Sequence, residues 1–493
     1  MAKKKMTLEE KLEEAIVKDV PYEVPQNWIW SKLGSISTLI TGNTPSKKNV
    51  EYYGESIPFI KPNDLDQGRR LKYSMEMLSS LGAEKARVLP KGSTAVCCIG
   101  SIGKAAYLEV EGATNQQINS IIPNKVNNLY IYYYVLSEYF QKELVSNSSA
   151  TTISIINKSK MSELVIPLSP LKEQQRIVDK IESLFEKLDK AKELIEEARD
   201  DFEKRKSAIL EKAFRGELTK EWRANNRNKI LGKAELFNQI KEVRFSLITS
   251  NKERKEIESI FNDYKYIDET LPDGWIKLKS AMVCELISCG KTPTGSIVEK
   301  GEVAYLKVYN IVNNKIDFEY KQQFIDYETH STKLKNSMLR PNDVIMNIVG
   351  PPLKKIAIIP ETYKDWNMNQ ALVRFRTINC IDYKYYYYCL LYDDTLKDVI
   401  NATRGVVGQA NISVSQSRNL EIIVPSVEEQ KEIVRILDDL LGKEFKIEEL
   451  IDLEEQIELI KKSILAKAFR GQLGTNCEED ESALELLKEI VNT

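Results

Sequence analysis

Histidine is almost absent from this sequence, with His330 the only one among 493 residues. Ser-His-Asp and Cys-His catalysis need a histidine base, so both are disfavoured, and we interpret His330 as a loop residue. The seven cysteines form no Cys-x-x-Cys pair, which argues against a zinc site or disulfide framework and favours a reducing compartment. No apolar run is long enough to cross a bilayer. The sequence therefore predicts a cytoplasmic protein that does not associate with a membrane.

Motifs for covalent chemistry are also missing. Gly290-Lys291-Thr292 resembles the end of a phosphate-binding loop, but Glu285 stands where that loop needs its first glycine. We find no Asn/Asp-Pro-Pro-aromatic motif for amino-group methylation and no nuclease set of carboxylates and lysine. The sequence therefore predicts a non-catalytic chain that binds no cofactor and no metal.

Net charge does not identify a partner. The 71 Lys and Arg residues nearly balance 73 Asp and Glu residues, leaving a formal charge of −2. Short basic clusters occur at Lys47-Lys48, Arg69-Arg70 and Lys354-Lys355. Most clusters of this kind are solvated surface, so the charge pattern alone is weak evidence for nucleic-acid binding.

The most informative positive feature is an internal repeat. Lys212-Ala213-Phe214-Arg215-Gly216 returns 255 residues later as Lys467-Ala468-Phe469-Arg470-Gly471. Further landmarks recur in unchanged order: Trp28 with Trp275, Thr41–Pro45 with Cys289–Pro293, Lys61 and Asn63 with Lys307 and Asn310, Asn115-Gln116 with Asn369-Gln370, and Glu173-Gln174 with Glu429-Gln430. The sequence between them differs widely. The two halves are therefore expected to share a scaffold and to differ in the side chains that the scaffold presents.

The periodicity changes between the segments of each half. Short β-like runs alternate with turn signals in two globular regions, which predicts α+β domains. The tyrosine runs near 130–134 and 383–388 are interpreted as helix packing rather than as base-stacking platforms. Alternating steps of four and three predict coiled-coil seams, from Ile177 to Ile209 and from Ile433 to Ile464, the second including Leu453 and Ile460. Two such helices in one chain most simply pair with each other.

These patterns divide the chain into seven segments. They are an N-terminal helical segment at 1–27, a first globular domain at 28–167, a long helix at 168–216, a linker and helical segment at 217–270, a second globular domain at 271–425, a second long helix at 426–471, and a tail helix at 472–493. The predicted fold is α+β with a pseudo-two-fold internal repeat.

This arrangement resembles the specificity subunit of type I restriction-modification enzymes. The resemblance covers nearly the whole chain and is most specific at PLKEQQRIV with PSVEEQKEIV, at the two AFRG helix ends, at GELTKEWR and at ESALELLKEIV. It implies two target recognition domains, each reading one half of a split double-stranded DNA sequence, held apart by an antiparallel pair of long helices. It also implies two methyltransferase subunits and restriction/translocase subunits as partners, with S-adenosylmethionine, ATP and Mg on those partners.

Within this family, we expect DNA contacts from loops at equivalent places in the two domains. The side chains of Asn, Lys and Arg can pair with base edges, and lysine-rich loops can bind phosphate. The candidates are Thr44, Ser46, Lys47, Lys48, Lys61 and Asn63 in the first domain, and Lys291, Thr292, Thr294, Lys307, Tyr309, Asn310, Arg404 and Asn411 in the second. The loop from Ser146 to Thr152 is a further candidate. Asn115-Gln116 and Asn369-Gln370 recur in both halves, so we expect them to support the scaffold.

Two other readings are compatible with parts of the sequence. A coiled-coil interaction scaffold without a DNA role would explain the repeat and the missing catalytic motifs, but it would not need two divergent domains. The third reading is an enzyme with unrecognised carboxylate chemistry. The acidic residues of the two repeated halves do not form matching sets, which counts against this reading.

Overall fold

The computed structural model describes residues 6–149, 154–263, 265, 268, 270–403, 410–442 and 448–492. Its contacts divide the chain into two compact units, one of Met1–Ile195 with Asp452–Thr493 and one of Glu196–Ile451. Helix α7 (Leu171–Phe214) supplies its first part to unit 1 and its last part to unit 2. The α+β fold class is confirmed. Within the described ranges, no helix combines the length and the apolar character needed to span a membrane.

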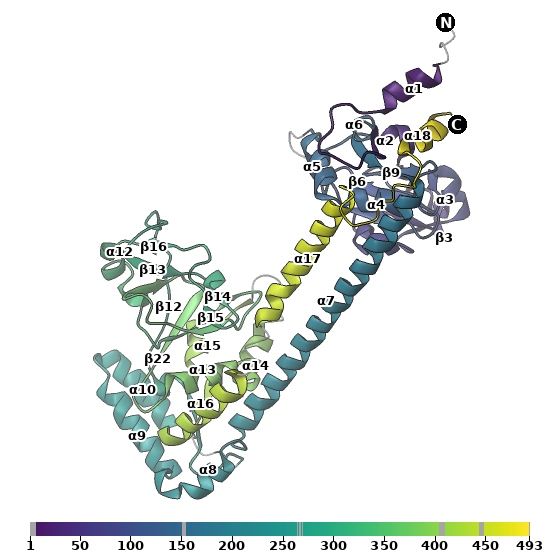
Figure 1. Ribbon diagram of the computed structural model, residues 1–493. Coiled ribbons are helices and arrows are strands. Elements are labelled where there is room, and N and C mark those ends of the chain that lie inside the picture. The colour runs from purple at the N-terminus through teal and green to yellow at the C-terminus, as the bar shows by residue number, and fades with distance from the viewer. Residues whose placement is uncertain are drawn as a thin grey trace. The chain divides into compact units, whose positions relative to one another are not determined.

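Unit 1 contains the first globular domain together with both ends of the chain (Figure 1). Its elements, besides the start of α7, are α1 (Leu8–Ala15), β1 (Ile29–Lys32), α2 (Leu33–Ile36), β2 (Ser37–Thr41), η1 (Val50–Tyr52), β3 (Tyr53–Ile60), η2 (Asp64–Arg70), β4 (Met77–Leu78), α3 (Ser80–Lys85), β5 (Val88–Leu89), β6 (Thr94–Cys97), β7 (Ala105–Tyr107), β8 (Gly112–Thr114), β9 (Ile118–Pro123), α4 (Asn128–Val135), α5 (Glu138–Ser146), α6 (Lys158–Ser162), β10 (Val165–Leu168), α17 (Glu448–Ala468) and α18 (Ala483–Val491).

Unit 2 contains the second globular domain. Its elements are the end of α7, α8 (Lys220–Asn225), η3 (Arg227–Lys229), α9 (Lys233–Ser246), α10 (Asn251–Asp263), β11 (Ile276–Lys279), α11 (Ser280–Val283), β12 (Cys284–Cys289), β13 (Val303–Leu306), η4 (Val308–Asn310), β14 (Ile311–Val312), β15 (Lys315–Ile316), β16 (Phe324–Ile325), α12 (Tyr327–Ser331), η5 (Lys335–Ser337), β17 (Met338–Leu339), β18 (Val344–Asn347), β19 (Val349–Gly350), β20 (Ile356–Ile358), β21 (Trp366–Met368), β22 (Leu372–Thr377), α13 (Tyr383–Leu391), α14 (Asp393–Thr403), β23 (Ala410–Asn411), α15 (Val414–Arg418), β24 (Glu421–Val424) and α16 (Val427–Gly442).

The repeat is present in the two four-stranded sheets and one two-stranded ribbon of each unit, and unit 2 adds the pairs β14-β15 and β19-β23. Unit 1 has sheets in the orders β2-β9-β6-β7 and β4-β3-β8-β5, and unit 2 has β12-β22-β18-β20 and β16-β13-β21-β17. A β1-β10 ribbon matches a β11-β24 ribbon, both antiparallel. Even the parallel pair within each second sheet recurs, as β3 with β8 and β13 with β21. Two chain halves with little sequence identity therefore build the same pairing scheme.

Each domain rests on the helix that follows it through one buried indole–carboxylate contact. Trp28 Nε1 donates to Glu173 Oε2 at 2.7 Å. In the second domain, Trp275 Nε1 donates to Glu429 Oε2 at 2.9 Å. All four side chains are buried, and a buried hydrogen bond to a carboxylate is costly to leave unmade. The recurring Trp and Glu landmarks are therefore scaffold residues.

The tyrosine runs form buried helices, as predicted. Asn127 caps α4 and Asp382 caps α13, each through side-chain contacts to the first free backbone N–H groups. Tyr130 OH donates to the Pro167 carbonyl at 2.7 Å, and Tyr385 OH donates to the Ile423 carbonyl at 2.9 Å. With their rings in the core and their hydroxyls bonded to backbone, Tyr130 and Tyr385 have no free face for a base.

Both AFRG runs end a helix and anchor it. Gly216 and Gly471 have φ of 75° and 69°, a left-handed conformation that favours glycine after a helix end. In unit 1, the Phe469 ring lies 5.2 Å from that of Tyr130 and 5.0 Å from that of Tyr134, between ring centroids. In unit 2, the Phe214 ring lies 5.0 Å from the Tyr392 ring and packs near Tyr385. Each AFRG phenylalanine therefore packs its helix end against the tyrosines of the globular domain in the same unit.

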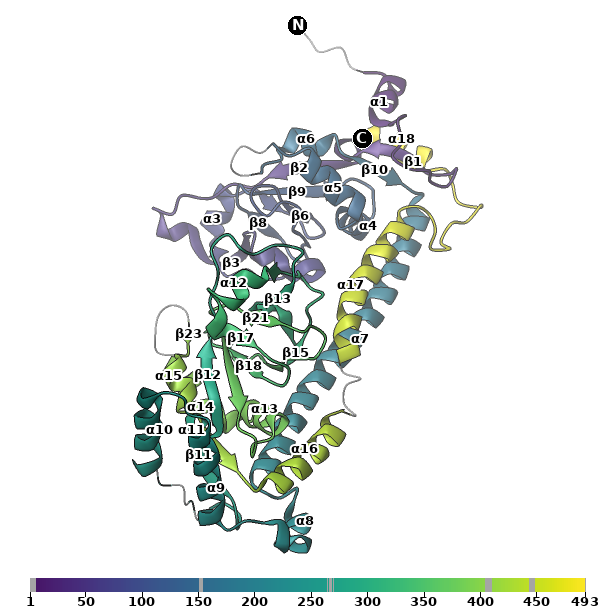
Figure 2. The same ribbon diagram turned by 90° about the vertical axis from the view of Figure 1, so that its left-hand side faces the viewer.

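Within unit 1, α17 runs alongside α7 in the opposite direction (Figure 1, Figure 2). Lys461 Nζ lies 2.8 Å from Asp189 Oδ1 and near the Phe185 ring. Ile181 and Leu465 are buried in the same core. The predicted antiparallel pairing of the long helices is thus present where both belong to one unit.

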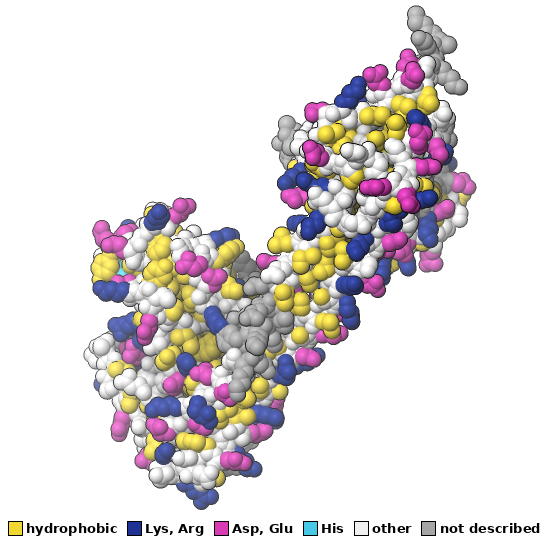
Figure 3. Space-filling model, viewed as in Figure 1, with side chains coloured by type: hydrophobic (Ala, Val, Ile, Leu, Met, Phe, Trp, Pro, Cys, Tyr) yellow, Lys and Arg dark blue, Asp and Glu magenta, His cyan; other side chains and the backbone are white. Residues whose placement is uncertain are grey.

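The predicted seam is wrong at two positions of α17. Leu453 and Ile460 are 39% and 44% exposed, whereas Ile457 and Leu465 are buried. Figure 3 shows hydrophobic side chains gathered over α17, where Leu459 is also exposed. The steps of three in this stretch rotate successive residues around the helix, so a fixed heptad cannot keep all of them on one side. In the second long helix, residues 443–447 lie outside the described part, between α16 and α17.

His330 is not a loop residue. It lies in α12 and is 1% exposed, with its Nδ1 3.1 Å from Asn367 Nδ2. Burial lowers the pKa of His330, which favours the neutral ring. The single histidine therefore serves the core of the second domain. The segment at 217–270, predicted as linker and helix, forms α8, η3, α9 and α10.

Candidate functional site

The loops that follow β2 and β12 hold the first group of predicted contact residues. A Cβ on Gly42 would lie 2.2 Å from the Thr114 carbonyl oxygen, and one on Gly290 would lie 2.1 Å from that of Asn369. Only glycine fits at such a close approach of two backbones. Gly290 is therefore required for packing, which explains the resemblance to a phosphate-binding loop without any phosphate.

A side-chain bond ties each of these loops to the repeated Asn-Gln pair. Thr44 Oγ1 donates to Gln116 Oε1 at 2.6 Å, and Thr292 Oγ1 bonds Gln370 Oε1 in the second domain. Asn115 is buried and bonds Gln117 through its side chain. The exposed Thr44 and Thr292 thus lie on loops held in equivalent positions. The expectation that the Asn-Gln pairs support the scaffold agrees with these bonds.

The turns after β3 and β13 carry the second group of predicted contact residues. Their hydrogen bonds correct the sequence-based pairing of Asn63 with Asn310. The Lys61 N–H donates to Asp64 Oδ2 at 2.8 Å, and the Lys307 N–H donates to Asn310 Oδ1 at 3.0 Å. Asn310 therefore corresponds to Asp64, and Asn63 corresponds to Tyr309.

Asn310 is the predicted contact residue that the structure most disfavours. It is 1% exposed, and its Nδ2 donates to the Asp317 and Tyr320 carbonyls at 3.2 and 2.9 Å. Since its oxygen also accepts from Lys307, the amide has no free face for a base edge. Asn310 therefore holds the turn, and its burial disfavours the predicted base contact.

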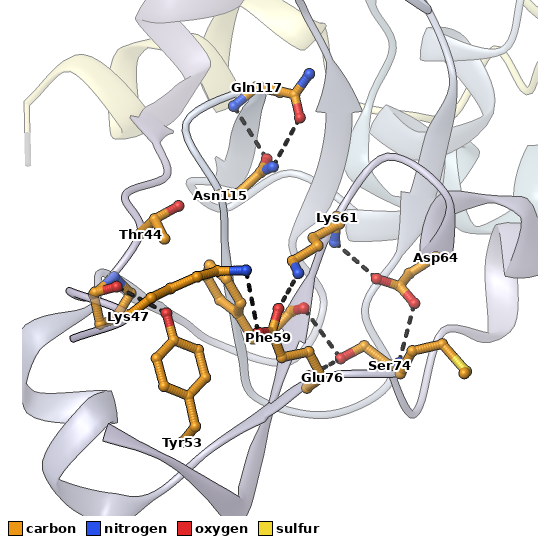
Figure 4. A network of polar contacts seen from close by, with 12 residues as sticks. Thr44, Lys47, Tyr53, Phe59, Lys61, Asp64, Ser74, Glu76, Asn115 and Gln117 are labelled. Carbon is orange, nitrogen blue, oxygen red and sulfur yellow. Dashed lines mark hydrogen bonds and ion pairs between the residues drawn. The ribbon is translucent and has the colours of Figure 1, made fainter. Parts of the chain in front are cut away.

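In the first domain, two predicted residues meet at one carboxylate (Figure 4). Glu76 Oε1 lies 3.8 Å from Lys47 Nζ, and Glu76 Oε2 is ion-paired with Lys61. Tyr53 OH donates to the Pro45 carbonyl at 2.8 Å, which holds the loop of Thr44 and Lys47 against β3. Burial and the Glu76 charge raise the pKa of Tyr53. We call Lys47, Lys61 and Glu76 the Glu76 cluster.

In the second domain, tyrosine side chains hold the equivalent loop and turn. Tyr305 OH donates to the Lys291 carbonyl at 2.9 Å and so holds the loop of Lys291 and Thr292. Tyr309 OH donates to the Lys321 carbonyl at 3.2 Å, and the Lys321 Nζ lies 4.9 Å from the centre of the Tyr320 ring. The two domains therefore present an ion-pair cluster and an aromatic cluster at related places.

The other predicted residues are more scattered. Ser46, Lys48, Asn63, Lys291 and Thr294 are exposed on the loops already described. Asn411 is also exposed, but it lies in β23, which pairs with β19 through Val349. Arg404 and residues 150–152 of the Ser146–Thr152 loop lie outside the described residues. All of these contact assignments stay predictions.

Sequence reasoning missed Glu76, which is ion-paired with Lys61, and Gln323, which holds the equivalent strand position in the second domain. The Phe59 N–H donates to the Glu76 carbonyl and the Tyr305 N–H donates to the Gln323 carbonyl, both at 2.9 Å. A usable signal was the exposed Tyr73, whose counterpart at a shift of 247 residues is Tyr320. Extending the repeat through that pair would have aligned Glu76 with Gln323.

The protein-family model for the type I restriction modification DNA specificity domain matches this chain twice, at residues 25–199 and 272–459. The chain is 22% identical over 459 residues to the EcoBI type I restriction enzyme specificity subunit of Escherichia coli, covering 91% of this chain and 87% of that protein. It is 25% identical over 468 residues to the MjaIX specificity subunit of Methanocaldococcus jannaschii, covering 92% and 94%. It is 35% identical over 171 residues to the HindI specificity subunit of Haemophilus influenzae, covering 33% and 37%.

A solved chain from work on complex assembly and conformational transition of the type I R-M system has the same fold. It aligns with a TM-score of 0.60 at 18% identity, covering 92% of this chain and 100% of that chain. The two family matches include both globular domains and most of both long helices. This chain therefore belongs to the family of type I restriction modification DNA specificity domains and carries that domain twice.

Proposed function

We propose that this chain is the DNA-specificity subunit of a type I restriction-modification complex, binding a bipartite and asymmetric double-stranded target. One observation carries the proposal: two domains have the same sheet orders and the same indole–carboxylate support, but different exposed side chains at equivalent turns. A repeated scaffold suits two similar grooves of one duplex, and different side chains suit two different half-sites.

The two domains have the chemistry that DNA recognition needs. Lys47 and Lys48 are exposed on one loop and can bind phosphate, which positions a protein without reading sequence. Lys61 and Asn63 in the first domain, and Lys307 and Tyr309 in the second, lie on equivalent turns where a base edge can be met. Sequence selection then comes from the differences between the turns.

Catalysis is assigned to partner subunits. The relatives named above are specificity subunits of type I restriction enzymes. By that relationship, we expect this chain to bind two methyltransferase subunits and, in a restricting complex, restriction/translocase subunits. S-adenosylmethionine, ATP and Mg would then be held by those partners rather than by this chain.

The alternative of a coiled-coil scaffold without a DNA role is not favoured. Such a scaffold would be expected to match relatives along its helices only. The family matches instead include both globular domains, whose exposed loops are the parts that the scaffold reading leaves without a purpose.

The decisive experiment is to map modified bases across a genome with and without this chain, in cells that carry its methyltransferase partner. We expect a split motif to be methylated only when the chain is present. A chain with Phe214 and Phe469 both changed to Ala, which removes the helix anchors, serves as a control that should abolish the motif. An unchanged methylation pattern without the chain would refute the proposed function.

A further inference from the structure

Glu76 and Gln323 occupy the same position in the two domains. In the first domain, Ile57 pairs with Leu78 and Pro58 with Met77. In the second, Val303 pairs with Ile325 and Ala304 with Phe324. In the next bond of each ladder, the Phe59 N–H donates to the Glu76 carbonyl and the Tyr305 N–H donates to the Gln323 carbonyl. The hydrogen-bond register therefore aligns the two residues independently of sequence identity.

The lysines of the following turns are also equivalent. Lys61 and Lys307 each come directly after the strand, and the N–H group of each donates to the side chain of the turn residue three positions later. Lys61 is ion-paired with Glu76, and Lys307 holds the equivalent turn position of the second domain. The residue at the aligned strand position is a carboxylic acid in the first domain and an amide in the second.

Glu76 is accessible enough to meet a ligand. Its side chain is 27% exposed, and the lysines paired with it, Lys47 and Lys61, are 67% and 37% exposed. Figure 4 shows both lysines directed to this one carboxylate. An ammonium has three donors and a carboxylate has about four acceptor positions, so neither group is saturated by the ion pair.

Gln323 has an unmet hydrogen-bonding need. Its Oε1 is buried and accepts no hydrogen bond from any residue in the described part of the chain, although the side chain as a whole is partly exposed. A buried acceptor without a donor is unfavourable, so this conformation of the amide is held only weakly. Rotation of the partly exposed side chain brings the amide to the surface, where it can accept from and donate to a ligand.

We propose that Glu76 and Gln323 are paired specificity-determining positions, Glu76 selecting a G·C pair in the first half-site and Gln323 selecting an A·T pair in the second. This inference rests on the proposed DNA-recognition function. In the major groove, guanine offers the O6 and N7 acceptors and cytosine offers the N4 donor. The Lys61 ammonium and the Glu76 carboxylate, side by side, match that donor and acceptor pattern. An amide instead matches the N6 donor and N7 acceptor of adenine.

The test exchanges the two side chains at constant shape. The variants are Glu76→Gln, Gln323→Glu and the double variant, each as the full chain co-purified with its methyltransferase partner. The probe is a library of randomised double-stranded DNA, from which bound duplexes are selected and sequenced. Glu109→Gln is the matched control because Glu109 is 29% exposed and pairs with Lys72 at 2.9 Å, outside the Glu76 cluster.

We expect Glu76→Gln to reduce the preference for G·C over A·T by about tenfold at one position of the first half-site, with the second half-site unchanged. Gln323→Glu should change one position of the second half-site in the opposite direction. Glu109→Gln should leave both motifs as in the unmodified chain.

The outcomes separate this inference from the proposed function. If the unmodified complex selects no motif, the proposed function fails. If it selects a split motif that neither variant alters, or if the variants only weaken binding to all sequences, Glu76 and Gln323 are structural and this inference is overturned. Because the two variants lie in different domains, Gln323→Glu decides the matter if Glu76→Gln does not fold.

Discussion

In the first domain, the turn after β3 carries an exposed Asn63 followed by Asp64, whereas the turn after β13 carries Tyr309 followed by Asn310. The second residue of each pair does the same work, accepting from the backbone N–H of the preceding lysine. The first residue differs in size and chemistry. The inward residue, Asp64 or Asn310, must accept this hydrogen bond, so its side chain needs an oxygen acceptor. The residue before it, Asn63 or Tyr309, has no such requirement and differs between the domains.

The same contrast holds between the cores and the loops. Trp28 and Trp275 donate to buried carboxylates in the same way, but the first domain has an ion-pair cluster around Glu76 where the second domain has a tyrosine cluster around Tyr309. A core contact must be met by both partners at once, so it changes rarely. An exposed loop residue is constrained only by the ligand that it binds. This difference explains how one scaffold can serve two half-sites.

The largest effect should come from replacing one domain completely. Exchange of residues 28–165 for the equivalent domain of another such subunit should replace one half of the methylated motif and leave the other half intact. The reason is that each domain has its own sheets and its own support by the helix that follows it. Methylated-base sequencing measures the result, and alteration of both halves would show that recognition is not modular.

The next effect concerns the helix anchors. Phe469→Ala should destabilise the packing of α17 in unit 1 by about 3–5 kcal/mol, as is typical for a buried Phe, and leave unit 2 unaffected. Phe214→Ala should do the reverse. Hydrogen exchange of backbone amides resolves the two units. Leu459→Ala is the control because that side chain is 62% exposed, and equal loss of protection in both units would contradict the assignment.

A smaller effect is expected for phosphate contacts of the first domain. Changing both Lys47 and Lys48 to Ala should weaken binding to all sequences and make the slope of log affinity against log salt shallower by about 1.8, from about 0.9 per phosphate contact. Binding titrations at several salt concentrations measure this, with the exposed Lys142 of α5 changed to Ala as control. A new motif at full affinity would mean that these lysines read bases instead.

The smallest effect is a pH dependence of stability. Burial raises the pKa of Glu173, although the hydrogen bond from Trp28 opposes this. A raised folded-state pKa gives stability that is present below the unfolded value, about 4.3, and is lost as pH rises through the folded value. Glu173→Gln should therefore gain stability relative to the unmodified chain as pH rises from about 4. Denaturant unfolding at several pH values tests this, and an unchanged difference would exclude a raised pKa.

Much of the scaffold could be predicted from the sequence. The AFRG ends, the Trp and Glu landmarks and the buried tyrosine helices carry local signals, because helix ends need glycine and buried helices need apolar residues. The α7 seam was predictable for the same reason, since its period follows from helix geometry. Leu453 and Ile460 were misplaced because a heptad does not record which side of α17 the domain covers.

The candidate site was predicted less well. Asn310 was chosen because asparagine can pair with adenine, but residue type does not reveal whether the side chain faces inward. Glu76 was missed because the pairing of β3 with β4 brings it beside Lys61, fifteen positions earlier in the chain. His330 was read as a loop residue because its burial depends on Asn367, which is distant in sequence.

The sequence by itself determined the repeat, the positions of the helix ends and the family, because each of these is encoded in short motifs of neighbouring residues that recur in the same order in both halves. The tertiary structure decided which side chain of each turn faces inward and which carboxylate meets which lysine. Those choices depend on strands that pair across many residues, and a contact between distant segments has no local signature in the chain.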